Sequence, residues 1–288
     1  MQRAFFTAFT TIFLATTPAL AQRDFSAVEI KVTEVASNIY MLEGSGGNIG
    51  LSAGDDGAFV IDDQFAPLSD KIAAAIKTVT DKPVEFVLNT HHHGDHTGGN
   101  EAFGGSGAYI VAHDNVRGRL AAADGTPDAA LPVITFSEST TFHQNGHEIH
   151  IFHPDNAHTD GDAIVHFRDA NVVHMGDVFF SGRYPYIDVA SGGDIDGYIL
   201  ALETTAAMMD DNTKVIPGHG PLSVKADVMA SIAMLNDVRS RVQALIDRGL
   251  DEDAAVAADP LAHLSEAWGW QFIDGERMTR AAYQTLAE

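Results

Sequence analysis

Residues 91–96 read HHHGDH and follow directly on the largely apolar run 84–90, VEFVLNT. Alternate side chains of a strand lie on one face, so continuing this run places His91 and His93 on the same side. Gly94 then allows the backbone to turn, which brings the next two residues to that side as well. Imidazole and carboxylate groups are ligands for zinc, iron and manganese. Six residues are therefore predicted to deliver four metal ligands to one point, although a histidine-rich surface turn is an alternative.

The same arrangement recurs three times later in the chain. In each case an apolar β run is followed by glycine or aspartate and then by a ligand-type residue. The ligand-type residues are His158 after the run 148–152, Asp177 after 171–173 and His219 after 214–216. Loops at strand ends are where protein scaffolds usually carry chemistry. A surface turn does not predict ligands at these other strand ends, so the repetition favours a metal site.

At this point the chain resembles the metallo-β-lactamase-fold superfamily. The matching residues, in order, are His91, His93, Asp95, His96, His158, Asp177 and His219, preceded by Asp62 at the end of the run 59–61. The resemblance runs from about Val28 to about Pro221. It implies an α/β protein, an αββα sandwich of two mixed β-sheets flanked by helices, with the metal site along one edge.

The resemblance also implies how the ligands are divided between two adjacent ions. His91, His93 and His158 would hold one ion, Asp95, His96 and His219 would hold the other, and Asp177 would bridge them. The chain has no cysteine, so every ligand is nitrogen or oxygen. Such a set suits two Zn²⁺ ions per chain without excluding iron or manganese.

Two ions of this kind imply hydrolysis of a small carbonyl substrate by a metal-bound hydroxide. Asp95 would be the catalytic residue that orients this nucleophile, and Asp62 would fix the tautomer of a ligand histidine. Arg183 lies six residues after Asp177, where β-lactam-hydrolysing relatives often hold the substrate carboxylate with a basic residue. We expect Arg183 to bind substrate, with Tyr184 or Tyr186 shaping the wall, although a surface salt bridge explains Arg183 equally well.

Other histidines and the tryptophans have simpler interpretations. His92 lies between two ligands and is expected to point to the opposite face, into packing or solvent. His174 precedes the Gly176-Asp177 pair and is expected to support that motif. For Trp268 and Trp270 we expect packing in the core or between helices, with the mouth of the pocket as the alternative.

Residues 1–21 have the features of a secretory signal peptide. Arg3 is followed by an apolar stretch, and small residues precede the expected cleavage site after Ala21. An uncleaved membrane anchor is the alternative, but the stretch is short for a transmembrane helix. We expect an exported protein, periplasmic or extracellular, in which residues 22–288 form a single metallo-β-lactamase-like domain with a helical C-terminal part.

The apolar periodicity predicts the order of the elements. Strands are expected at 28–32, 39–42, 84–88, 109–112 and 214–216, β-rich structure at 133–173, and helices at 69–78, 116–123, 196–209, 228–246, 251–257 and 276–286.

The formal charge of −23 restricts the partners. Binding to a phosphate backbone requires positive charge, so nucleic acid is excluded, and anionic membrane surfaces are disfavoured for the mature form. The expected partner is a small-molecule substrate, and the sequence leaves the oligomeric state open.

Several substrates fit the ligand set. The best-known secreted β-lactamases of the superfamily have cysteine where this chain has Asp177, and the pairing of Asp177 with His96 resembles glyoxalase II-type thioesterases and lactonases. Because export separates the protein from cytosolic thioesters, we favour β-lactamase-like hydrolysis of a cyclic amide. The alternatives are a lactonase or esterase, a glyoxalase II-like thioester hydrolase, an enzyme of sulfur or phosphate-ester metabolism, and a non-enzymatic metal-binding protein on this scaffold.

Overall fold

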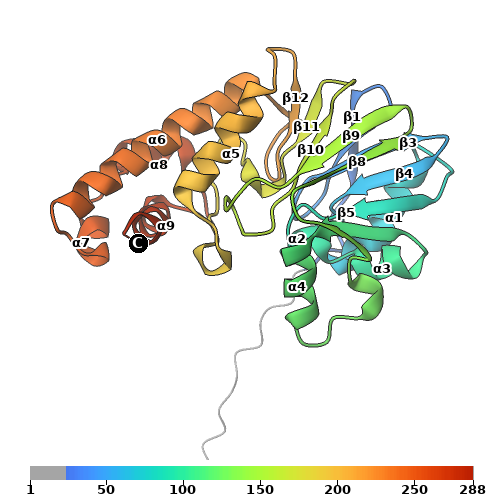
Figure 1. Cartoon of the computed structure of the whole chain (residues 1–288), viewed down its shortest axis with the longest axis horizontal. Helices are drawn as coiled ribbons and strands as arrows, with labels where there is room; N and C mark the ends of the chain where they lie inside the picture. The colour runs from blue at the N-terminus through green and yellow to red at the C-terminus, as the bar shows by residue number, and fades with distance from the viewer. Residues whose placement is uncertain (1–23, 288) are drawn as a thin grey trace, which may run out of the picture.

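The computed structural model describes residues 24–287 and shows two β-sheets packed face to face between layers of helices (Figure 1). The predicted signal peptide, residues 1–21, lies outside the described residues. The four layers confirm the predicted αββα sandwich. Within the described part of the chain, no helix combines the length and the hydropathy needed to cross a membrane.

The first sheet has seven strands in sequence order. They are β1 (Lys31–Ala36), β2 (Ile39–Glu43), β3 (Ile49–Gly54), β4 (Gly57–Ile61), β5 (Val84–Leu88), β6 (Tyr109–His113) and β7 (Ile134–Phe136). The first four form an antiparallel meander, and β4 to β7 are parallel to one another. Every residue of β4 is buried, as expected for a strand that is covered on both faces.

The second sheet has six strands in the order β13-β12-β11-β10-β9-β8. They are β8 (Ser139–Gln144), β9 (His147–Phe152), β10 (Ile164–Phe167), β11 (Val172–His174), β12 (Lys214–Ile216) and β13 (Ser223–Val224). The pair β11 and β12 is parallel, whereas β10 is antiparallel to both of its neighbours. Strands β9, β11 and β12 therefore run in the same direction and end at one edge.

The helices cover the outer faces of the two sheets. They are α1 (Ser69–Lys77), α2 (Gly94–Thr97), α3 (Asn100–Gly105), α4 (Asp114–Ala122), α5 (Ile195–Ala207), α6 (Lys225–Asp247), α7 (Glu252–Ala257), α8 (Ala262–Trp268) and α9 (Gly275–Leu286), with single 3₁₀ turns at Ala66–Leu68, Asp128–Ala130, Gly176–Val178 and Val189–Ser191. Helices α5 to α9 gather on the side of the second sheet, and α1 and α3 lie on the side of the first (Figure 1).

Apolar side chains fill three layers of core. One cluster lies between the two sheets and includes Phe59, Ile151 and Val165. A second joins the first sheet to α1 through Ile72 and Ile76, and a third joins the second sheet to the C-terminal helices. Burial of these apolar faces is the main stabilising contribution of the sandwich.

The predicted first strand begins three residues too early, because the backbone at 25–28 has other partners. The Lys71 ammonium donates to the carbonyl oxygens of Phe25, Ser26 and Val28 at 3.0, 2.7 and 2.7 Å. Pairing in β1 starts only at Lys31, opposite Glu43. Helix α8 is not predicted from the sequence, because the segment shows little apolar periodicity. In the structure none of its residues is buried, which agrees with this weak pattern.

The strand directions explain where the site lies. Strands β4 and β5 are parallel, and so are β11 and β12, so their carboxyl ends meet at one edge of the sandwich. Asp62 follows β4, His91 follows β5, Asp177 follows β11 and His219 follows β12. His158 follows β9, which runs in the same direction as β11. Ligands that are far apart in sequence are thereby brought to the same edge.

Candidate metal centre

A loop and one helical turn present the ligands of the HHHGDH stretch, and this corrects the predicted strand extension. Strand β5 ends at Leu88, three residues before His91, and α2 begins at Gly94. His93 precedes this helical turn, whose first turn contains Asp95 and His96. The side chains reach the same point as predicted, but the loop geometry and not strand alternation aims them there.

The first group of ligand atoms consists of three imidazole nitrogens and one carboxylate oxygen. Nδ1 of His93 lies 3.1 Å from Nε2 of His91 and 3.0 Å from Nε2 of His158. Oδ2 of Asp177 lies 3.8 Å from Nε2 of His91 and 3.7 Å from Nε2 of His158. Such a set of converging atoms is suited to one divalent ion.

The second group faces the other oxygen of the same carboxylate. Oδ1 of Asp177 lies 3.2 Å from Nε2 of His96 and 3.4 Å from Nε2 of His219. Oδ2 of Asp95 lies 3.5 Å from Nε2 of His219. Asp95, His96 and His219 thus form a second candidate ion site, and Asp177 stands between the two groups with one oxygen toward each.

Asp62 connects the outer faces of both groups. The buried Asp62 carboxylate accepts a hydrogen bond from Nδ1 of His96 at 2.7 Å. It also accepts from the Thr90 hydroxyl at 2.7 Å, and this hydroxyl lies 3.1 Å from Nδ1 of His91. These contacts hold the proton on Nδ1 and leave Nε2 of His96 and His91 free to bind a metal, as partners of ligand histidines usually do.

The other two histidines of the first group have partners that the sequence did not reveal. Nε2 of His93 lies 2.9 Å from Oδ2 of Asp188, and Nδ1 of His158 lies 2.7 Å from the backbone oxygen of Tyr186. Asp188 was not predicted, because it follows no strand and lies in the long loop before α5. Its position in space, 95 residues from His93, is a product of the fold.

The protonation states of the first group suit metal binding. Burial lowers the pKa of His91 well below its ordinary value and that of His158 to about 4, so both rings are neutral near pH 7. Burial opposes the charge of Asp177, yet His219, His96 and His91 hold its pKa well below the ordinary value. Neutral imidazoles around an ionised carboxylate are the forms that ligate zinc.

In the second group burial opposes the charge of His96, yet Asp177, Asp62 and Asp95 raise its pKa well above the ordinary value. This ring must therefore release a proton to bind a metal.

Unpartnered atoms and close backbone contacts also fit metal ions at this position. Nε2 of His96 and Oδ1 of Asp177 are buried and have no hydrogen-bond partner, although buried polar atoms are normally paired. A Cβ at Gly47 would lie 2.1 Å from the His96 ring, so glycine is needed there. The donor atoms are therefore packed into place without partners of their own, as expected for ligands.

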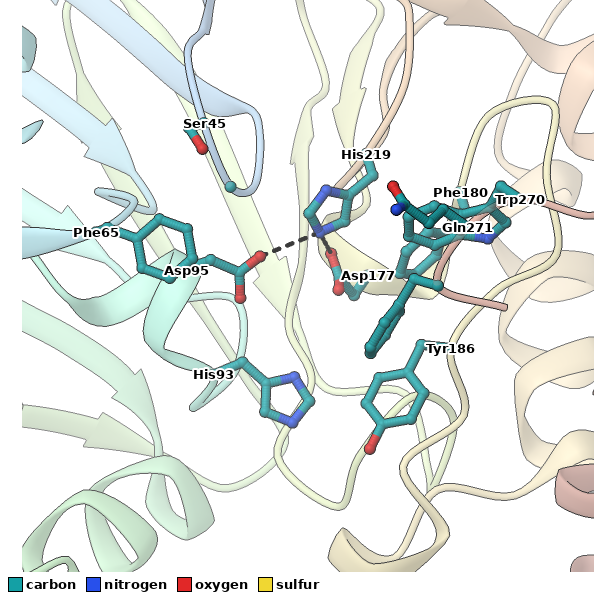
Figure 2. A pocket seen from close by; sticks show the side chains of 12 residues that line it. Ser45, Phe65, His93, Asp95, Asp177, Phe180, Tyr186, His219, Trp270 and Gln271 are labelled. Atoms are coloured by element: carbon teal, nitrogen blue, oxygen red, sulfur yellow. Dashed lines mark ion pairs between the residues drawn. The ribbon is translucent and has the colours of Figure 1, made fainter. Parts of the chain in front are cut away.

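A cavity of about 760 Å³ opens onto these ligands. Figure 2 shows Phe65 and Asp95 on one side, Phe180, Trp270 and Tyr186 on the other, and His219 between them. Gln271 and Phe272 complete the aromatic side, and Ser45 and Gly46 approach from the β2–β3 loop. Trp270 thus lines the cavity, as the alternative interpretation expected, and it also packs against the buried C-terminal cluster, as Trp268 does.

The predicted substrate residues take different places. Tyr184 is fully buried in the C-terminal core and does not line the cavity, so its assignment to the substrate is wrong. Tyr186, two residues further along the chain, lines the cavity instead. The Arg183 guanidinium lies 5.1 Å from the centre of the Trp270 ring, behind the cavity wall. The Trp270 indole in turn donates to the backbone oxygen of Tyr184 at 3.0 Å.

The remaining histidines near the motif take two different places. His92 is half-buried, and its Nε2 lies 3.5 Å from the Ser191 hydroxyl; contrary to the expectation that it points away, it forms a third group of potential ligands with His93 and Asp188. His174 is buried and supports the motif from behind, because its Nδ1 accepts from the backbone N–H of Gly176 and its Nε2 donates to the backbone oxygen of Asn48.

Comparison with known proteins places this geometry in a family. Residues 32–219 match the family model of the metallo-beta-lactamase superfamily. A hydroxyacylglutathione hydrolase from Polaromonas sp. is 29% identical over 196 residues, which are 67% of this chain and 68% of that protein. One from Pelagibacter ubique is 30% identical over 50% of this chain, which spans only 56% of that relative.

Solved structures share the fold at low sequence identity. A metallo-beta-lactamase from Pontibacter korlensis has a TM-score of 0.64 at 21% identity and aligns over 73% of this chain and 100% of its own. A stereoselective inverting sec-alkylsulfatase from Pseudomonas sp. has a TM-score of 0.68 at 17% identity, over 88% of this chain and 50% of its own. The family match, the two sheets and the ligand groups agree, and the chain belongs to the metallo-β-lactamase superfamily as a metal-dependent hydrolase.

Proposed function

We propose that this protein is an exported dinuclear zinc hydrolase that cleaves an ester or lactone whose acyl group in the metal cavity is uncharged and largely apolar. The observation that supports it best is the Asp177 carboxylate, whose two oxygens face two separate groups of ligand atoms. The nitrogen and oxygen donors suit zinc. Two ions at these positions would supply an activated water and polarise the substrate carbonyl.

The residues of the chain would support this reaction in distinct ways. Asp95 is the half-buried carboxylate that lines the cavity beside the second ligand group, so it can orient the nucleophile and accept its proton. Asp62 and Asp188 hold ligand imidazoles in one tautomer from behind. The reacting carbonyl would lie between the two groups, above Asp177.

The cavity lining supports the choice of an uncharged acyl group. Phe65, Phe180, Tyr186, Trp270 and Phe272 all contribute aromatic surface. None of the described residues that line this cavity is a lysine or an arginine. A substrate carboxylate bound against these rings would lose its hydration without gaining a cationic partner, which is costly. This argues against a substrate carboxylate within this cavity and favours an apolar acyl group there.

A β-lactam is the second candidate, and Arg183 is the observation that favours it. Its guanidinium stacks on Trp270, one ring behind the cavity wall. A rotation of this side chain past the indole would bring a cation to the cavity mouth. If this occurs, Arg183→Ala will raise KM for β-lactams more than for neutral esters, and equal effects will remove Arg183 from the site.

Export and domain organisation form part of the proposal. Residues 1–21 support secretion to the periplasm or beyond, and residues 22–288 would form one domain whose C-terminal helices complete the cavity. Outside the cytoplasm, a lactone or ester is a more accessible substrate than an intracellular thioester.

A hydrolysis panel on the mature protein tests the function. Zinc-loaded protein should contain two zinc ions per chain and hydrolyse aryl esters or lactones faster than a β-lactam, a thioester or a phosphodiester. A chelator should abolish this activity, and zinc should restore it. Zinc binding without turnover of any member would support the metal-binding scaffold instead, and failure to bind zinc would refute the dinuclear assignment.

A further inference from the structure

A second cavity lies directly beside the metal cavity and is not explained by the proposed chemistry. It has a volume of about 450 Å³ and is lined by residues of the loop 185–190 and of α9. Tyr186 and Phe272 line both cavities. Their rings are 5.4 Å apart and inclined by 69°, so one pair of aromatic side chains forms the boundary between the two spaces.

The charges in the second cavity differ from those around the metal ligands. Arg280 lines it but is already paired with Glu252, Asp253 and Glu276. Asp188 also lines it, and its carboxylate is paired with His93. The charge of Arg280 is thus balanced by these carboxylates, and Asp188 is anionic, so neither residue offers a free cation to a ligand.

Arg277 is the exception. It lines the second cavity, and within residues 24–287 no carboxylate lies within ion-pair distance of its guanidinium. One N–H donates to the backbone oxygen of Phe272, and the guanidinium lies 5.7 Å from the centre of the Phe272 ring. An arginine has five N–H donors, so several stay available for an anion. In a chain of formal charge −23, an unpaired cation in a cavity is an unusual feature.

Aromatic rings link this cation to the metal ligands. The Tyr186 ring stacks on His93 with centroids 5.8 Å apart, and the Phe272 ring makes an edge contact with Tyr186. Phe272 then contacts Arg277. The Phe272 side chain is 48% exposed, so the apolar chain of a substrate can lie across this ring without displacing core residues. These contacts form a continuous row of side chains from the candidate ligand His93, over the Tyr186 and Phe272 rings, to the Arg277 guanidinium.

We infer that the second cavity is the distal part of the substrate site and that Arg277 binds a carboxylate there. The substrate class is an extended half-ester of a dicarboxylic acid, with its ester at the metal ligands, its apolar chain over Tyr186 and Phe272, and its free carboxylate on Arg277. The inference rests on the proposed esterase function. It is compatible with the cation-free first cavity, because the carboxylate lies beyond that cavity.

The test compares half-esters of straight-chain dicarboxylic acids of increasing length with the matched diesters, which lack the charge. For the zinc-loaded wild type we expect the preference for the half-ester to appear only beyond a minimum chain length. Arg277→Ala should reduce this preference about tenfold, which corresponds to about 1.4 kcal/mol, mainly through KM, because the carboxylate loses a charge-assisted hydrogen bond. Arg277→Lys should restore part of it.

The control variant is Arg248→Ala, an exposed arginine at the end of α6 that lines neither cavity. It should keep the full preference, which separates local binding from the general loss of positive charge. Arg277→Ala should leave the folding of α9 intact. The N-cap residue Asp274 accepts a hydrogen bond from the backbone N–H of residue 277, and the substitution keeps this N–H. A non-hydrolysable ether analogue, measured by calorimetry, should show the same loss of affinity in Arg277→Ala.

The outcomes separate the two proposals. Hydrolysis of diesters without any preference for half-esters, or a preference that Arg277→Ala leaves intact, would overturn the distal site while leaving the esterase function standing. Loss of hydrolysis for both ester types in the wild type would refute the esterase function itself. Binding of the ether analogue that is equal in Arg277→Ala and Arg248→Ala would also overturn the role of Arg277.

Discussion

Gly218 lies so close to Asp177 that a Cβ at this position would be 2.1 Å from Oδ1 of the carboxylate. The glycine precedes the ligand His219, and its backbone N–H donates to the backbone oxygen of Gly176 at 2.7 Å. The loop after β12 is thus pressed against the loop after β11. Because Asp177 faces both ligand groups, the absence of a side chain at 218 is a condition for the two groups to share it.

Gly218→Ala should therefore reduce metal content and activity together. The added methyl group forces the Asp177 carboxylate or the backbone to shift, and real Cβ atoms essentially never tolerate such a contact. We expect less than one zinc ion per chain and a loss of kcat/KM of at least about a hundredfold, since ligand geometry must be kept to a fraction of an ångström. Elemental analysis and steady-state kinetics measure both.

Gly94→Ala is the matched control for this substitution. It lies in the HHHGDH stretch, but a Cβ placed there would meet no atom within 4 Å apart from its chain neighbours and its own helix backbone. Zinc content near that of the wild type is expected. If both variants lose zinc equally, the contact between Gly218 and Asp177 is not what holds the site.

Asp62→Asn should weaken zinc binding without removing a ligand. The carboxylate accepts from Nδ1 of His96 and from the Thr90 hydroxyl, so the amide would present a donor where an acceptor is required. Loss of such a partner typically costs about 10–100-fold in metal affinity. Competition with a chromophoric chelator would measure it.

The neighbouring Asp63 offers a control for Asp62. Asp63 is also fully buried, and burial raises its pKa well above the ordinary value. One of its oxygens accepts from the backbone N–H of Gly99 and the other has no partner, so Asp63 bonds to no ligand histidine. Asp63→Asn keeps an acceptor for Gly99 and should leave zinc affinity within about threefold of the wild type. Equal losses in both variants would contradict the role of Asp62.

Trp270→Ala should affect substrates according to the size of their acyl group. The ring lines the metal cavity and is held by its hydrogen bond to the Tyr184 oxygen and by stacking against Arg183. For long apolar acyl esters we expect KM to rise about tenfold, because the lost contact amounts to about 1–2 kcal/mol. Acetyl esters, which cannot reach the ring, should show a much smaller change. An effect independent of acyl size would indicate a general disturbance of the site.

His113 should make the stability of the protein dependent on pH. Its Nδ1 accepts from the backbone N–H of Asn115 at the start of α4, and its Nε2 donates to the backbone oxygen of Ser137. Only the neutral ring makes both bonds. Burial and the stacked His153 ring, 4.0 Å away, lower its pKa, against the weaker opposing effect of Asp114 and Asp160.

The direction of the effect follows from this lowered pKa. As the pH falls below about 6.5, the unfolded chain takes up the proton before the folded protein does. The stabilisation is complete above about pH 6.5 and is lost as the pH falls through the pKa of the folded state. Urea unfolding should show a smaller loss of stability on acidification in His113→Asn, which retains a capping acceptor. Parallel losses in variant and wild type would show that His113 does not titrate as described.

Several features were predictable because they depend on local patterns. The run 84–88 followed by HHHGDH indicated both a buried strand and a ligand cluster, and the later strand ends identified His158, Asp177 and His219. Strand ends are visible in sequence because apolar runs stop where polar ligands begin. Parallel strands then bring these ends to one edge, which is why a one-dimensional pattern predicted a three-dimensional site.

Other features depend on which segments the fold places side by side. Neither Asp188, which contacts His93, nor Gly218, which contacts Asp177, carries a signal that identifies its partner in the sequence. Tyr184 and Tyr186 are two residues apart, yet one is buried and the other lines both cavities, because the loop 183–188 turns between the core and α9. The sequence alone determined the family of the fold and the set of candidate ligands. Only the tertiary structure decided the walls of the cavities and the position of Arg277, since these depend on contacts between the C-terminal helices and loops that are distant in the chain.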